Sequence, residues 1–346
     1  MINLAQRRCL LVGLAVLLPL LLLATWKFTH GVPEAPLVAS LADGRSGRFL
    51  FTSYNAQSSD LDTGAFHKAP VKLLGELFLP EREKGRVPAV ILMHGSDGLT
   101  DHQYRTARSL RSLGLAVFVV DSFTGRGVDN TITDQGAVTV HSMLVDAYQA
   151  LALLQTHPSI DPNRIALVGW SKGGTVADWA SRVRYRTMLS PVGRTFAAHV
   201  AFYSWCGEQH LPVQLTGAPL LYLTGERDDW TGTAACIDYV KRVREAGFHA
   251  KLVIYPHAEH AFDYPGPFRR YLGSAQSWAH CNYIWGETHF RVAHTGDLLP
   301  WTEFGRYVDA CTSRGAHVGS NAFARSDAAK ELREFLAGAL ALRKDG

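Results

Sequence analysis

Residues 169–173 have the composition of a turn that presents a serine nucleophile. They read Gly-Trp-Ser-Lys-Gly, the pattern G-x-S-x-G, in which a sharp strand-to-helix turn exposes the hydroxyl of the central residue, Ser171. A buried-strand pattern at 165–168 precedes the turn, and helix formers at 175–184 follow it. Glycines on both sides relieve the crowding that a Cβ would cause. This context indicates that Ser171 is a catalytic nucleophile.

A serine hydroxyl is a weak nucleophile, so it needs an adjacent base that a third group orients. Carboxylates at Asp228 and Asp229 follow one apolar strand pattern, and imidazoles at His257 and His260 follow the next. The order serine, acid, histidine along the chain, each after a strand, is typical of hydrolases of the α/β type. We expect Asp228 to be the acid and His260 the base. Asp229 and His257 are the alternatives.

Backbone N–H groups must stabilise the negative charge that develops on a substrate carbonyl oxygen during acyl transfer. One donor is expected from Lys172, the residue after the nucleophile. The other is expected from Ser96, in the loop 94–98 after the strand pattern 89–93, with Gly95 as the alternate. We expect the side chain of Lys172 to lie in solvent.

Apolar runs and helical patterns alternate along the chain, which predicts an α/β fold with a mostly parallel central sheet and helices on both faces. A C-terminal insertion at 264–325, without a clear period, is expected to cover one end of the sheet. Strands are expected at 49–54, 71–79, 89–93, 115–120, 165–168, 197–203, 219–223 and 251–255, and helices at 102–113, 137–156, 175–184, 233–246 and 328–342.

An apolar run at residues 9–26, flanked by basic residues, departs from the rest of the chain. The pattern is typical of a signal peptide or an N-terminal membrane anchor. We expect an uncleaved anchor with the folded body outside the cytoplasm, either periplasmic or secreted. The expected organisation is a leader at 1–30, a linker at 31–48 and one hydrolase domain at 49–346.

Beyond Cys9 the sequence has four cysteines, which allow three pairings. Outside the cytoplasm an even set is more often bridged than free. Cys206 follows a strand and Cys236 begins the helix after the acid, so both are expected at the same rim of the sheet. This favours a Cys206–Cys236 bridge and leaves Cys281 to pair with Cys311. No C-x-x-C pair occurs, so we expect no metal site.

The 346 residues carry a formal net charge of +4, with 47% hydrophobic and 19% charged residues. No basic run is interleaved with aromatic residues, so we expect no nucleic-acid partner. The expected partner is a small-molecule ester, together with a membrane if the leader is retained. No organic cofactor is expected.

Residues 71–263, together with the C-terminal helix, resemble the dienelactone hydrolase family of α/β hydrolases, in particular its exported members. The resemblance implies the α/β-hydrolase fold and a triad of Ser171, Asp228 and His260 that cleaves a carboxylic ester through an acyl-enzyme. It rests on His94-Gly95, Gly-Trp-Ser-Lys-Gly-Gly at 169–174, Gly225-x-x-Asp228 and His260-Ala261-Phe262.

Two features of the chain differ from the family's namesake enzymes. Those enzymes use a cysteine nucleophile with a glutamate beside the oxyanion loop, whereas this chain has Ser171 and Gly95-Ser96. A general carboxylic ester is therefore expected in place of a dienelactone. The namesakes also bind the substrate carboxylate with an arginine in the loop where Arg126 lies here, about one residue offset. Arg126 has two open roles, a substrate contact or a structural ion pair.

Two alternative functions share part of this evidence. The pattern Gly-Trp-Ser-x-Gly-Gly also occurs in serine peptidases of the prolyl-oligopeptidase type, although the chain has no room for their N-terminal propeller. A non-catalytic, membrane-tethered binding module with an idle triad is the other alternative. Aromatic residues of the insertion are expected either to line a substrate pocket or to pack a small core: Trp278, Tyr283, Trp285 and Trp301.

Overall fold

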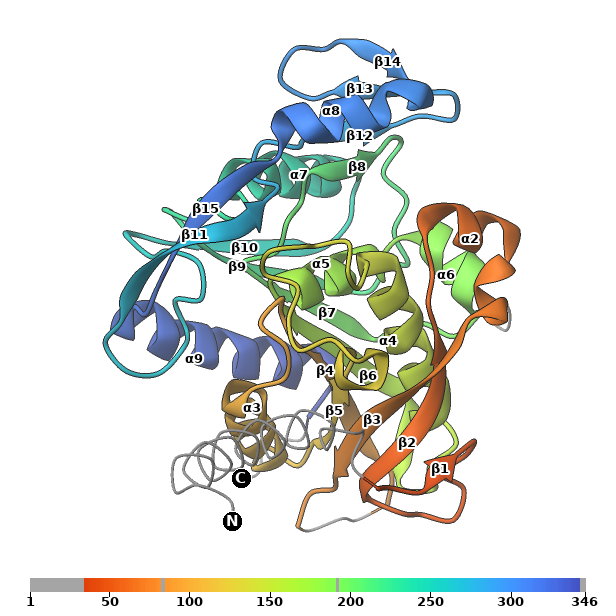
Figure 1. Ribbon diagram of the computed structural model, residues 1–346. Helices are drawn as coiled ribbons and strands as arrows, with labels where there is room; N and C mark the ends of the chain where they lie inside the picture. The colour runs from red at the N-terminus through yellow and green to blue at the C-terminus, as the bar shows by residue number, and fades with distance from the viewer. Residues whose placement is uncertain (1–33, 82–84, 191–192, 343–346) are drawn as a thin grey trace, which may run out of the picture. The chain divides into compact units, whose positions relative to one another are not determined.

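The computed structural model of the chain describes residues 34–81, 85–190 and 193–342 (Figure 1). The expected leader at residues 1–30 lies outside these described ranges. Within them, no helix is both long enough and apolar enough to cross a bilayer. The unit that begins at Pro36 contains the elements discussed below.

Within the described ranges, a nine-stranded sheet has the order β1-β2-β3-β5-β4-β6-β7-β9-β10. The strands from β5 to β10 in this order run parallel, and β3 pairs antiparallel with both β2 and β5. The strands are β1 (Leu37–Val38), β2 (Gly47–Tyr54), β3 (Pro70–Phe78), β4 (Val87–Met93), β5 (Ala116–Asp121), β6 (Ile160–Trp170), β7 (Ala198–Phe202), β9 (Leu220–Gly225) and β10 (Ala250–Tyr255).

Helices cover both faces of this sheet. One face packs against α4 (Val140–Leu154), α5 (Lys172–Trp179) and α7 (Thr233–Glu245). The opposite face packs against α3 (Asp101–Arg111) and α9 (Ala322–Ala339). Central strands must therefore be apolar on both sides, which explains their continuous apolar runs. The predicted fold class, a mostly parallel sheet between two layers of helices, is confirmed.

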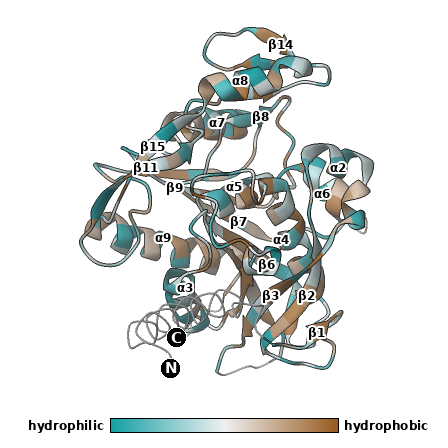
Figure 2. Cartoon of the chain, viewed as in Figure 1, coloured by the Kyte–Doolittle hydropathy of each residue, from teal (hydrophilic) through white to brown (hydrophobic). Residues whose placement is uncertain are grey.

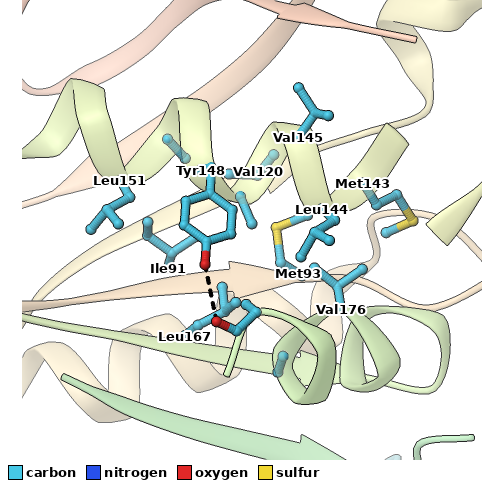
Figure 3. Close-up of a cluster of buried hydrophobic side chains, with 14 of the residues drawn as sticks. Ile91, Met93, Val120, Met143, Leu144, Val145, Tyr148, Leu151, Leu167 and Val176 are labelled. Atoms are coloured by element: carbon cyan, nitrogen blue, oxygen red, sulfur yellow. Dashed lines mark hydrogen bonds between the residues drawn. The ribbon is translucent and has the colours of Figure 1, made fainter. Parts of the chain in front are cut away.

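Alternate residues of β4 show how the two faces are packed. Ile91 and Met93 belong to the cluster that contains α4, whereas Val90 and Leu92 belong to the cluster under α3 and α9. Figure 3 shows Ile91 and Met93 against α4, where the hydroxyl of Tyr148 donates to the carbonyl oxygen of Ala180 at 3.0 Å. Figure 2 shows hydrophobic colouring along β2 and β3 and mostly hydrophilic residues on α3. Close packing of this kind fixes the positions of the strand ends.

The segment expected as a linker at 31–48 contributes to the sheet where it is described. Residues Leu37–Val38 form β1 and pair in parallel with β2, which begins at Gly47. Leu41, between them, is fully buried, and its backbone N–H donates to the Thr156 hydroxyl at 2.7 Å. Burial of Val38 and Leu41 stabilises this segment against the sheet, whereas Leu37 is exposed.

The helix expected at 175–184 is divided in the structure. α5 ends at Trp179, and α6 (Val183–Leu189) begins after an extended residue, Arg182. At this point the backbone pairs with a distant segment: Arg182 forms an antiparallel bridge with Leu215, and the Val183 N–H donates to the Gln214 carbonyl at 3.0 Å. The last helix, α9, begins at Ala322 rather than 328, because the Asn321 side chain caps it by accepting from the Ala324 N–H at 3.0 Å.

Residues 264–321 form small elements outside the main sheet. β11 (Arg269–Ser277) pairs antiparallel with β15 (Ser313–Gly319). A second, four-stranded sheet has the order β14-β13-β12-β8 and includes β8 from the preceding part of the chain. Its strands, and the helix that follows them, are β8 (Glu208–His210), β12 (Tyr283–Trp285), β13 (His289–Val292), β14 (Leu298–Pro300) and α8 (Phe304–Cys311).

Candidate active site

Ser171 lies at the turn between β6 and α5 in a backbone conformation rare for an L-residue, with φ 53° and ψ −116°. Its N–H donates to the carbonyl oxygen of Phe202 at 2.9 Å. A Cβ on Gly169 would collide with the carbonyl of Gly173, and a Cβ on Gly173 would collide with the carbonyl of Met93. The two glycines are therefore required by close backbone approach at the turn.

His260 joins the serine to a carboxylate. Its Nε2 lies 3.0 Å from Ser171 Oγ, and its Nδ1 lies 2.9 Å from Asp228 Oδ2. Ser171 follows β6, Asp228 follows β9 and His260 follows β10. These strands run parallel, with β7 between β6 and β9, so their carboxyl ends bring the three side chains to one edge of the sheet. All three are buried. The arrangement permits proton transfer from Ser171 to His260.

Asp228 is held by donors other than the histidine. Its Oδ1 accepts from the backbone N–H groups of Trp230 and Thr231 at 3.0 and 3.1 Å, and its Oδ2 accepts from the Thr231 hydroxyl at 2.7 Å. Burial by itself would raise the pKa of Asp228, but His260 and the Thr231 donors outweigh it, so the pKa lies below its ordinary value. The carboxylate is therefore ionised and fixed in direction.

The structure does not bring the two alternative residues to Ser171. The carboxylate of Asp229 accepts from the backbone N–H of His317 at 2.8 Å and lies 2.7 Å from its Nδ1. His257 is exposed, and its Nδ1 lies 3.0 Å from the guanidinium of Arg227. Both side chains have surface partners of their own.

The loop that carries Ser96 packs against the nucleophile. A Cβ on Gly95 would lie 3.2 Å from Ser171 Cβ. Ser96 is fixed because its carbonyl accepts from Thr131 N–H at 2.7 Å and its hydroxyl donates to Gln135 at 2.9 Å. Among the described residues, the N–H groups of Ser96 and Lys172 donate to no protein acceptor. Both donors are thus available to an oxygen atom of a bound molecule.

The expectation that the Lys172 side chain lies in solvent is wrong. Lys172 is 5% exposed, and its ammonium group donates to the carbonyl oxygens of Gln135 and Val138 at 2.8 and 2.7 Å. The polar loop before α4 folds over the turn and encloses the side chain. Burial lowers the pKa of Lys172 to about 7, although Asp134 opposes this shift.

Of the two roles left open for Arg126, the structure contains the structural ion pair. Its guanidinium donates to both carboxylate oxygens of Asp146 on α4, at 2.8 and 2.9 Å. It also donates to the carbonyl of Ser122 at 2.6 Å and to that of Tyr54 at 3.1 Å. Asp146 is fully buried and needs this cation. Arg126 does not line either cavity beside Ser171.

Another buried carboxylate, Asp263, lies near His260 and is not among the residues predicted from the sequence. It accepts from Trp170 Nε1 at 2.9 Å and from the Tyr203 hydroxyl at 2.7 Å, and His102 Nε2 lies 3.0 Å away. The Tyr203 ring lies 4.6 Å from that of His260. Asp263 therefore holds Tyr203 in place, and the Tyr203 ring in turn packs against His260. The signal in the sequence was an acidic residue directly after His260-Ala-Phe.

Two cavities adjoin Ser171, one of about 370 Å³ and one of about 130 Å³. Trp278 and Tyr283 line the larger cavity, whereas Trp285 and Trp301 line neither and pack against each other at 4.1 Å. Among the described residues, no group of three histidine, cysteine or acidic side chains is arranged to hold a metal ion.

Two disulfides hold the surroundings of the site. Cys206, after β7, is joined to Cys236 in the first turn of α7. Cys281, before β12, is joined to Cys311 at the end of α8. In each bridge the two cysteines are 30 residues apart in the sequence. The first bridge connects the element after the Asp228 loop to the end of the neighbouring strand.

Two curated relatives share part of the sequence. The first is the probable 2-oxo-3-(5-oxofuran-2-ylidene)propanoate lactonase of Bradyrhizobium sp, 28% identical over 195 residues, which covers 51% of this chain and 74% of the relative. The second is the putative hydrolase YtaP of Bacillus subtilis, 27% identical over 142 residues, which covers 35% of this chain and 46% of the relative. The chain thus spans less than half of the second relative's length.

Solved structures with low sequence identity also align with the chain. Esterase 2 of Thermogutta terrifontis is 16% identical, with a TM-score of 0.47, over 57% of this chain and 81% of that one. A putative dienelactone hydrolase of Klebsiella pneumoniae is 20% identical, with a TM-score of 0.45, over 63% of this chain and 89% of that one.

The model of the dienelactone hydrolase family matches residues 74–283, which is more than half of the sequence. The matched range includes the turn at Ser171, the Asp228 loop and His260, and it ends within β12. The chain is therefore a hydrolase with the α/β-hydrolase fold and belongs to the dienelactone hydrolase family.

Proposed function

We propose that the protein is a serine hydrolase that cleaves carboxylic esters through an acyl-enzyme on Ser171. The observation that carries the proposal is the position of His260, which lies within hydrogen-bond distance of both Ser171 Oγ and the Asp228 carboxylate. Membership of a hydrolase family supports the reaction class. The lactonase activity in the name of the Bradyrhizobium relative supports an ester bond as the target, because a lactone is a cyclic ester.

In the first half of the reaction, Ser171 Oγ attacks the ester carbonyl carbon while His260 Nε2 accepts its proton. Asp228 keeps Nδ1 protonated and stabilises the imidazolium that forms. The backbone N–H groups of Lys172 and Ser96 stabilise the oxyanion, each by about 3 kcal/mol. The tetrahedral intermediate then breaks its bond to the alcohol oxygen, which takes the proton from His260, and the acyl group stays on Ser171.

In the second half, a water molecule takes the place of the alcohol. His260 accepts a proton from the water as it attacks the acyl-enzyme, and it returns that proton to Ser171 Oγ when the acid leaves. Atoms balance with ester and water as the only reactants. No step requires the side chain of Arg126, which is committed to Asp146.

We also propose that the protein works outside the cytoplasm. The two disulfides support this location, because such bridges persist in oxidising compartments. The apolar run at 9–26 would direct export. Cell fractionation followed by N-terminal sequencing of the recovered protein tests both parts, since it gives the compartment and shows whether the leader is retained.

The direct test of the catalytic proposal uses the full-length protein, a p-nitrophenyl acetate assay and a fluorophosphonate probe, which reacts only with an activated serine. The wild type should hydrolyse the ester and take up the label. Ser171→Ala should lose both, whereas Ser313→Ala, an exposed serine on β15, should keep both. Undiminished hydrolysis by Ser171→Ala would refute the proposal. A wild type that takes up no label would favour a non-catalytic binding module.

A further inference from the structure

The two cavities beside Ser171 have three lining residues in common. Ser96, Ser171 and Trp230 line both of them. Trp230 is fixed there because its indole N–H donates to the Gln276 carbonyl at 2.9 Å and its ring lies 4.8 Å from that of His260. An ester bound at Ser171 must therefore place its acyl part on one side of the shared residues and its alcohol part on the other.

The position of His260 decides which part lies on which side. His260 lines the smaller cavity and is absent from the lining of the larger one. General-acid catalysis requires the alcohol oxygen to lie within hydrogen-bond distance of His260 Nε2 when the bond breaks. The alcohol must therefore extend into the cavity of about 130 Å³, and the acyl group into the cavity of about 370 Å³.

Aromatic side chains form much of the larger cavity's wall. They pack edge to face: Trp205 and Trp278 lie 5.5 Å apart, and Tyr283 and Phe304 lie 5.1 Å apart, so the wall is rigid. Ring faces of this kind favour planar apolar groups. The aromatic lining residues are Trp179, Trp205, Trp230, Trp278, Tyr283 and Phe304.

The charged groups at the larger cavity already have protein partners. The ammonium of Lys172 donates to two backbone carbonyls. The carboxylate of Glu208 accepts from the hydroxyls of Tyr185 and Tyr283 at 3.0 and 2.8 Å and pairs with Arg182 at 3.3 Å. Among the described lining residues, an anionic acyl group would therefore meet no lysine or arginine without protein acceptors, and a buried charge that no opposite charge compensates is costly. A neutral acyl group avoids this cost.

We infer that the larger cavity binds the acyl group and that the substrates are esters of neutral aromatic carboxylic acids with small alcohols. This inference rests on the proposed serine-hydrolase function. It assigns a binding role to residues 278–304, which contribute Trp278, Tyr283 and Phe304 to the wall. It also explains why the site has no free cation for a substrate carboxylate among the described lining residues.

Two isomeric esters test the assignment with the full-length protein. Methyl 3-phenylpropanoate carries its ring in the acyl group, and 2-phenylethyl acetate carries the same ring in the alcohol. We expect kcat/KM to be at least about tenfold higher for the first, because misfit in an apolar pocket typically costs this much or more. Equal values, or a preference for 2-phenylethyl acetate, would overturn the assignment.

A charged ester tests the requirement for a neutral acyl group. Monomethyl glutarate carries a free carboxylate in its acyl part, and methyl hexanoate provides a neutral chain of similar length. Methyl hexanoate should have the higher kcat/KM. Preference for the anionic ester would show that the larger cavity does bind a charged acyl group, and the neutral class would then be wrong.

Two substitutions that fill one cavity each provide matched controls. Val140 lines only the larger cavity and Ile132 only the smaller, and neither is fully buried. Val140→Trp should lower the ratio of kcat/KM for methyl 3-phenylpropanoate over 2-phenylethyl acetate, whereas Ile132→Trp should raise it. Near-ultraviolet circular dichroism checks that both variants fold. Shifts of the ratio in the same direction would contradict separate acyl and alcohol cavities.

Fluorophosphonate labelling of the same preparation distinguishes failure of the cavity assignment from failure of the proposed serine-hydrolase function. If Ser171 takes up the label but neither isomer is hydrolysed, the cavity assignment fails and the serine-hydrolase proposal stands. If Ser171 takes up no label, the proposed function itself fails. Labelling together with a preference for methyl 3-phenylpropanoate supports both.

Discussion

Lys172 donates a hydrogen bond of 2.8 Å from its ammonium group to the carbonyl oxygen of Gln135. The residue that follows the nucleophile thereby also holds a wall of the larger cavity, because Gln135 lines that cavity. One residue thus has two separable roles: its backbone N–H is the proposed oxyanion donor, and its side chain positions the loop before α4.

Replacement of Lys172 by methionine should change how stability depends on pH. Burial lowers the pKa of Lys172 to about 7, whereas an unfolded lysine has a pKa of about 10.4. Between these values the unfolded chain binds one more proton than the folded chain, so the free energy of unfolding rises with pH. Relative to Lys172→Met, the wild type should gain about 1.4 kcal/mol per pH unit above about pH 8 and roughly half of that slope near pH 7, where the folded lysine is half protonated.

Urea unfolding at several pH values measures this difference. Lys241→Met is the matched control, because Lys241 is exposed on α7 and its replacement should leave the pH dependence unchanged. If the difference in the free energy of unfolding between the wild type and Lys172→Met were the same at pH 7 and pH 9, the pKa of Lys172 would not be lowered by burial.

Substitution of the two neighbouring aspartates should separate the acid from its alternative. Asp228→Asn should lower kcat by about 10⁴-fold, since an amide at this position no longer favours the histidine tautomer that can accept the serine proton. Asp229→Asn should reduce kcat only slightly, because that carboxylate binds His317 at the surface. Steady-state hydrolysis of p-nitrophenyl acetate measures both. Similar losses in the two variants would argue against Asp228 as the acid.

The two histidines after β10 provide a second matched pair. His260→Ala should lower kcat by at least about 10⁴-fold, because Ser171 then has no base. His257→Ala should retain most of the activity, since His257 is exposed and its polar contacts are with Arg227 and Glu226 on the acid loop. Equal activity of the two variants would place the base elsewhere.

Removal of either disulfide should lower the free energy of unfolding by a similar amount, but the two removals should affect catalysis differently. Each bridge closes a loop of 30 residues, which corresponds to about 3 to 4 kcal/mol in the chain-entropy model.

The double replacement of Cys281 and Cys311 by alanine should also weaken the preference for a bulky acyl group, because Tyr283 and Phe304 lie between these cysteines. The double replacement of Cys206 and Cys236 should mainly lower kcat, because that bridge braces the Asp228 loop.

Urea unfolding and the isomeric ester pair measure these effects. An unchanged ester preference after loss of the Cys281–Cys311 bridge would argue against an acyl wall built from residues 278–304.

The interior strands could be predicted from the sequence because helices cover both faces of the sheet. An apolar run such as 89–93 is a local signal that a strand covered on one face would lack. The short strands of the second sheet, such as β8 and β12, have three residues each and no period. Their pairing depends on contacts between distant parts of the chain, so no local pattern indicates them.

Around the nucleophile, too, only features with a local sequence pattern could be predicted. The turn at Ser171 has a local signature because sterics require glycine at fixed positions. Burial of Lys172 depends on a loop some 35 residues earlier folding over it, and the partner of Arg126 lies 20 residues away on α4. Asp263 acquires its donors from three separate elements. These contacts follow from the fold and not from local sequence.

The proposed mechanism requires an activated hydroxyl at Ser171, and peptide mapping of the fluorophosphonate adduct tests this directly. Digestion and mass spectrometry of the labelled full-length protein should place the adduct on Ser171, and His260→Ala should label far more slowly. An adduct on any other residue, or equal labelling rates in the wild type and His260→Ala, would contradict a nucleophile at Ser171 that His260 activates.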